Sequence, residues 1–69
     1  MPMHRLPDEL PAWIGEATVR AIEEAAQRAR ARGRDGAAEA WEAAWMRHPA
    51  LPATAVTEAV AVVLRRAGL

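Results

Sequence analysis

The chain of 69 residues contains no cysteine, and it also lacks serine, asparagine, lysine, phenylalanine and tyrosine. Without cysteine it can form neither a disulfide nor a thiolate metal site, and this composition fits a reducing compartment. No stretch approaches the roughly 20 apolar residues of a membrane span, and the first residues carry no apolar run of signal-peptide length. The sequence therefore predicts a cytoplasmic protein that does not enter a membrane.

Side chains that carry enzymatic chemistry are scarce. Serine and cysteine nucleophiles are missing, and the two histidines, His4 and His48, lie far apart without a partner at metal-ligand spacing. The acidic pairs Glu23/Glu24 and Glu39/Glu42 occur without a Glu-x-x-His pattern, and there is no glycine-rich phosphate loop. We therefore expect a protein that is not an enzyme and holds no metal or cofactor.

The charges balance, with nine arginines against nine acidic residues. A net charge of zero argues against a general polyanion binder. A chain of this length forms one domain. Domains below roughly 70–80 residues seldom bury a core worth more than about 3–5 kcal/mol without a disulfide, a metal or a partner. The size of the chain thus favours a protein that associates with itself or with another chain.

Apolar residues recur at three- and four-residue spacing in three segments, which predicts an all-α three-helix bundle. A long first helix is expected over residues 8–32, and two shorter helices are expected over residues 36–47 and 54–67. They would form a single helical domain over residues 7–69, after a flexible N-terminal arm at residues 1–6.

The expected helix ends follow from local chemistry. Asp8 is a suitable N-cap for the first helix, and Gly33 can take the left-handed conformation that ends it. Asp35 can cap the second helix. Pro49 ends that helix, and Thr54 is the expected N-cap of the third.

The expected first helix would be about 37 Å long, roughly twice the length of either other helix. Its apolar stripe, continued through Ala25 and Ala29, would then extend past the bundle. Antiparallel pairing of two copies would set the acidic half, Asp8 to Glu24, against the basic half, Arg28 to Arg34. The sequence thus predicts a homodimer that buries this surplus stripe.

Trp41 and Trp45 lie one helical turn apart and share a face. They are either core aromatics or, because Trp is enriched at interface centres, part of a binding surface. Met46 is adjacent, Trp13 lies beside the apolar stripe of the first helix, and Val62 lies off the core face of the third. We therefore expect a protein interface with these members: Trp13, Trp41, Trp45, Met46 and Val62.

Arg28, Arg30, Arg32 and Arg34 alternate with alanine and glycine, which places 28 and 32 on one face and 30 and 34 on another. Solvated surface charge is the plainest interpretation. The alternatives are contact with acidic groups of a partner, or with phosphate.

These patterns predict a small protein–protein interaction module, such as an adaptor, a small subunit or an antitoxin-like inhibitor. Its partner would be a second copy, a larger chain, or both. The second hypothesis is a nucleic-acid-associated helical protein that uses the segment Arg28–Arg34.

Overall fold

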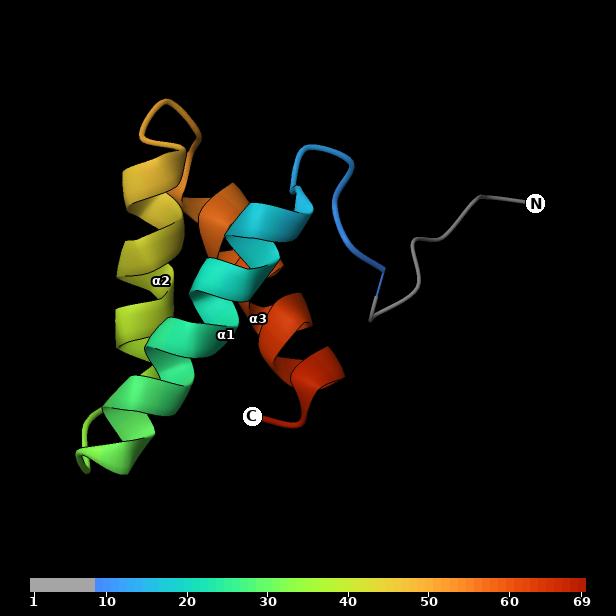
Figure 1. The fold of residues 1–69 in the computed structure, drawn as a ribbon. Helices are drawn as coiled ribbons and strands as arrows, with labels where there is room; N and C mark the ends of the chain where they lie inside the picture. The colour runs from blue at the N-terminus through green and yellow to red at the C-terminus, as the bar shows by residue number, and fades with distance from the viewer. Residues whose placement is uncertain (1–8) are drawn as a thin grey trace.

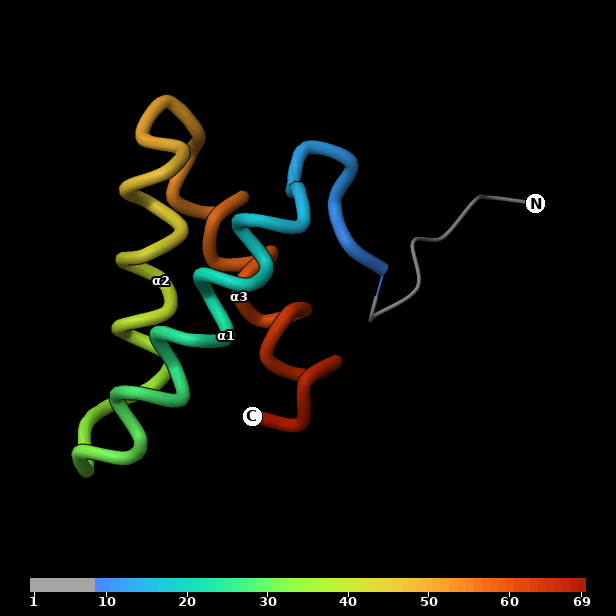
Figure 2. The backbone as a smooth tube through the Cα atoms, viewed as in Figure 1, coloured from blue at the N-terminus to red at the C-terminus, as the bar shows by residue number. Residues whose placement is uncertain are grey.

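A computed structural model describes residues 9–69 as three α-helices joined by short connections (Figure 1). They are α1, Glu16–Ala31; α2, Gly36–Arg47; and α3, Ala53–Ala67. The chain reverses between α1 and α2, which run side by side, and each helix contacts the other two (Figures 1 and 2). No strand occurs within residues 9–69. The expected all-α three-helix bundle is confirmed.

The first helix is shorter than the expected span 8–32. It has 16 residues, against 12 in α2 and 15 in α3. Before it, the amide of Ile14 donates to the carbonyl of Pro11 at 3.2 Å, and Gly15 is an extended N-cap (φ −100°, ψ 172°). A residue before proline is disfavoured in helical backbone, and glycine weakens a helix, so Pro11 and Gly15 together displace the start to Glu16. The expected cap Asp8 and the expected arm lie outside the described residues.

The connection between α1 and α2 has the expected chemistry. Gly33 is left-handed (φ 71°), its amide donates to the carbonyl of Arg30 at 3.0 Å, and the amide of Arg34 donates to Ala29 at 2.8 Å. These two bonds form a Schellman motif, which satisfies the last carbonyls of α1. The carboxylate of Asp35 then accepts from the first amides of α2, those of Ala37 and Ala38, at 3.0 and 3.2 Å. Both signals confirm this helix break.

The start of α3 differs from expectation. The helix begins at Ala53, and Pro52 rather than Thr54 occupies the N-cap position without a side-chain cap bond. Pro52 is extended (φ −61°, ψ 146°), and its carbonyl accepts from the amides of Ala55 and Val56 at 3.0 and 3.2 Å. Because its ring already fixes φ near the helical value, proline can open the helix without a capping side chain.

The contact between α1 and α2 is built from very small residues. At Gly36 a β-carbon would lie 3.2 Å from the carbonyl oxygen of Ala26, so the two helices approach to backbone distance. Alanine permits such close packing along the rest of the contact. Aliphatic side chains from α1 and α3 complete the buried cluster, whose members are Ile22, Ala26, Ala40, Ala44, Val56, Val60 and Val63.

The apolar stripe of α1 is covered within the chain. Ala25 is 7% exposed and Ala29 is 2% exposed, because α2 lies alongside the C-terminal turns of α1 (Figure 2). The surplus stripe expected for antiparallel pairing of two first helices is therefore not present. No helix within residues 9–69 combines the length and apolar composition that a bilayer span requires.

Candidate functional site

The two indoles of α2 lie on the side of that helix that faces α3. They contribute both to the core and to the surface, the two roles that the sequence left open. Trp41 and Trp45 stack with ring centroids 5.4 Å apart and planes at 10°. Both are half-buried and pack against the core cluster. The indole N–H of Trp41 donates to Oγ1 of Thr57 at 3.0 Å, and that hydroxyl donates to the carbonyl of Ala53 at 2.9 Å. The pair therefore holds α3 in place while part of each indole remains on the surface.

Trp13 lies in the turn before α1, and its ring contact is with His48 at the end of α2. The centroids are 4.9 Å apart in an edge-on arrangement at 69°. Nε2 of His48 also lies 3.0 Å from Oγ1 of Thr18, which is only 6% exposed. This cluster was not predicted from the sequence. Its one local signal is a threonine on the otherwise apolar buried face of α1.

Val62 is not on an outer surface, and its assignment to the interface is wrong for this fold. The side chain is 2% exposed. Arg66, one turn further along the same face of α3, shares a cavity of about 250 Å³ with Leu10 and Val19. The non-helical segment before α1 thus reaches α3 at the cavity that Leu10, Val63 and Arg66 line.

Among the described residues, Met46 is the large apolar side chain that remains exposed to solvent, with 74% of its surface accessible. It lies at a groove between α1 and α2 with a volume of about 440 Å³. Alanines form part of the lining, and charged side chains flank them; the lining residues are Ala21, Glu24, Arg28, Ala43, Met46 and Arg47. The groove therefore combines an apolar surface with guanidinium groups.

The four arginines from Arg28 to Arg34 do not form one patch. Arg28 lies 4.0 Å from Glu24, and Arg34 lies 3.7 Å from Glu39, both as exposed ion pairs. Arg30 packs its aliphatic part close to Gly36, at the contact of α1 with α2.

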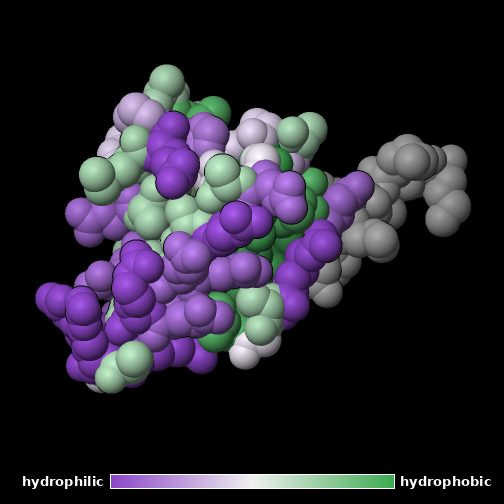
Figure 3. Space-filling model, in the orientation of Figure 1, coloured by the Kyte–Doolittle hydropathy of each residue, from purple (hydrophilic) through white to green (hydrophobic). Residues whose placement is uncertain are grey.

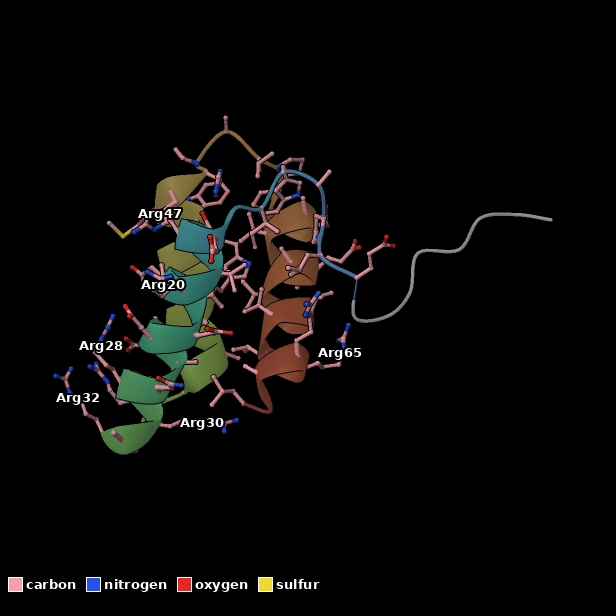
Figure 4. The ribbon with its side chains drawn as sticks, turned by 45° about the vertical axis from the view of Figure 1, so that its right-hand side comes forward. Arg20, Arg28, Arg30, Arg32, Arg47 and Arg65 are labelled. Carbon is pink, nitrogen blue, oxygen red and sulfur yellow. The ribbon has the colours of Figure 1, made fainter. Side chains whose placement is uncertain are left out.

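Arg28 and Arg32 instead lie on the same side of the molecule as Arg20 and Arg47, apart from Arg30 (Figure 4). Figure 3 also shows hydrophilic residues concentrated over the end of α1 and the loop to α2. Arg20 and Arg47 were not predicted as members of this group, because the grouping depends on how α1 and α2 pack.

No family model, curated protein or solved structure matches the chain. Within the part of the chain that the structure describes, no three His, Cys, Asp or Glu side chains form a group that could hold a metal ion.

Proposed function

We propose that the protein is a small, non-enzymatic helical module that binds another protein chain. The observation that carries the proposal is the exposure of Met46 at the groove between α1 and α2. A single exposed apolar residue is ordinary on a protein surface. An apolar side chain beside a helix–helix groove with alanines in its lining, however, is a shape that a partner can fill, and methionine adapts to varied partners.

The half-buried pair Trp41 and Trp45 supports the same class of function on the α3 side of α2. Tryptophan is enriched at the energetic centres of interfaces. Adaptors, small subunits and antitoxin-like inhibitors all belong to this class, with a larger chain or a second copy as partner. The cytoplasmic location expected from the composition is part of the proposal.

Site-specific photocross-linking in the cells that express the protein tests the proposal. A photoreactive residue at position 46 should form adducts with a protein, whereas the same residue at Ala67, exposed on α3, should not. Mass spectrometry of the adducts then identifies the partner. Equal adducts from both positions, or adducts with nucleic acid alone, would overturn the proposal.

A second candidate is nucleic-acid association, favoured by the grouping of Arg20, Arg28, Arg32 and Arg47 on one side of the molecule (Figure 4). If these four contacted phosphates of a duplex, the logarithm of the binding constant would fall with that of salt concentration at a slope of about −3 to −4. Fluorescence anisotropy with duplex and single-stranded DNA across a salt series measures that slope. The absence of DNA binding at low salt removes this candidate.

A further inference from the structure

We propose that the groove between α1 and α2 binds an acidic amphipathic helix of another protein. An apolar side chain of that helix would contact Met46, and its carboxylates would pair with Arg28 and Arg47. The inference rests on the proposed protein-binding function and specifies the chemistry of the partner.

The shape of the groove suits a helix. Its lining includes Ala21 from α1 and Ala43 from α2, whose short side chains let a partner backbone approach closely. Met46 supplies a flexible thioether beside them that can adjust to an incoming apolar side chain. The described residues offer no strand edge for main-chain pairing, so recognition here depends on side chains, as in helix-in-groove binding. From Ala21 to Arg28 the lining runs about 10 Å along α1, which matches about two turns of a partner helix.

The charge of the groove selects an acidic partner. Arg28 and Arg47 line it, and Arg20 and Arg32 lie on the same side of the molecule (Figure 4). The carboxylate of Glu24 is the one acidic group in the lining. Its pair with Arg28 spans 4.0 Å between side chains that are each more than half exposed, so it is weak.

The remaining guanidinium groups on this side are available. Arg20, Arg32 and Arg47 form no ion pair within residues 9–69. Two of the other acidic side chains are engaged elsewhere: Asp35 caps α2, and Glu39 lies 3.7 Å from Arg34. The lining of the groove itself holds two guanidinium groups against one carboxylate, in a chain whose net charge is zero.

This charge also argues against two other occupants. A second copy docked groove to groove would place guanidinium groups against guanidinium groups, and such like-charge contacts are unfavourable. A nucleic acid would neutralise the arginines through its phosphates, but it would leave Met46 and the alanines unburied. An acidic helix with an apolar stripe would bury Met46 and the alanines and would also neutralise the guanidinium groups.

Binding of two designed peptides to the full chain tests the inference by fluorescence anisotropy. Both peptides are amphipathic helices with the same leucine stripe, which is flanked by glutamates in one and by lysines in the other. We expect the glutamate peptide to bind at least about tenfold more tightly. Arg28→Glu/Arg47→Glu should weaken its binding by about tenfold, and Met46→Ala should weaken it too. The matched control Arg65→Glu, whose side chain lies away from the groove in Figure 4, should change binding by less than about twofold.

Several results would overturn the inference: equal binding of the two peptides, an equal loss in Arg65→Glu, or no effect of Met46→Ala. Competition by duplex DNA that does not depend on Met46, or cross-linking of two copies through position 46, would also overturn it. Circular dichroism confirms that each variant is folded. If Arg28→Glu/Arg47→Glu unfolds, Arg28→Gln/Arg47→Gln takes its place.

A cellular partner that depends on Met46 but not on the two arginines would overturn the inference and leave the proposed function intact. Cells that yield no cross-linked protein at position 46 would overturn the proposed function and the inference that rests on it.

Discussion

Nε2 of His48 lies 3.0 Å from the hydroxyl of Thr18, a residue 30 positions earlier in the chain. The two groups share one hydrogen bond, whose donor depends on the tautomer of the imidazole. His48 also ends α2, and its ring meets the edge of Trp13. One imidazole thereby joins the turn before α1, the first turns of α1 and the end of α2. The polar pair fixes how these segments align, because Thr18 is the buried polar side chain of the described core.

Thr18→Val keeps the shape of the side chain and removes the hydrogen bond to His48. We expect the free energy of unfolding to fall by about 0.5–1.5 kcal/mol, because a half-buried imidazole nitrogen loses its partner. Urea denaturation measures the change. Thr54→Val is the matched control: Thr54 is exposed in the first turn of α3, and its replacement should change stability by no more than about 0.5 kcal/mol. Equal effects of the two substitutions would show that the Thr18–His48 bond contributes nothing.

The stacked indoles give a second prediction, because within residues 9–69 only the N–H of Trp41 has a hydrogen-bond partner. Trp41→Phe keeps an aromatic ring against the core but removes the N–H that reaches Thr57. It should lower the free energy of unfolding by about 0.5–1.5 kcal/mol more than Trp45→Phe does. Thermal unfolding of both variants and of Thr57→Val, arranged with Trp41→Phe as a double-mutant cycle, isolates this bond. A coupling energy of zero would contradict it.

Full truncation to alanine tests the core interpretation of the same two residues. Loss of a fully buried Trp costs about 3–5 kcal/mol. Because Trp41 and Trp45 are half-buried, each alanine variant should lose less than that range, with the larger loss at Trp41. An unchanged melting temperature of Trp41→Ala would show that its indole does not support α3.

A helix end can be predicted from the sequence when the interactions that set it join residues close together in the chain. The break between α1 and α2 was predictable because Gly33 and Asp35 act on backbone groups within a few residues of themselves. The start of α1 was not, because Leu10 and Ile14 keep helical spacing although the chain between them turns. Apolar spacing does not report the effect of Pro11 on the residue before it.

The grouping of the arginines was likewise predictable only where it depends on residues of one helix. Helical spacing separates Arg28 and Arg32 from Arg30, and that separation holds in the fold (Figure 4). The addition of Arg47 to their side requires knowing which faces of α1 and α2 meet.

Gly15 and Gly36 each stand at the start of a helix, and they should respond differently to substitution by alanine. At Gly15 nothing lies within 4 Å of an added β-carbon and its φ is negative, but Gly15 is the N-cap of α1, where alanine is a poor cap. The entropy gain and the capping loss offset each other, so Gly15→Ala should change the free energy of unfolding by no more than about 0.5 kcal/mol. At Gly36 the added carbon would lie 3.2 Å from the backbone oxygen of Ala26, which cannot move without separating α1 from α2. Gly36→Ala should therefore lower stability despite the better helix propensity of alanine. Stabilisation by Gly36→Ala in chemical denaturation would contradict this close contact.

The last prediction distinguishes a stripe buried within the chain from one that is buried between chains. Ala29 is 2% exposed where α1 packs on α2, so Ala29→Leu should overpack that contact and cost about 1–3 kcal/mol. This loss should be the same across a wide range of protein concentration, since the contact lies within one molecule. A stripe that pairs two first helices would instead give a melting temperature that rises with concentration, together with a drop in light-scattering mass in the variant. Ala31→Leu, on the exposed side of the same helix, is the matched control and should leave both the melting temperature and the mass unchanged.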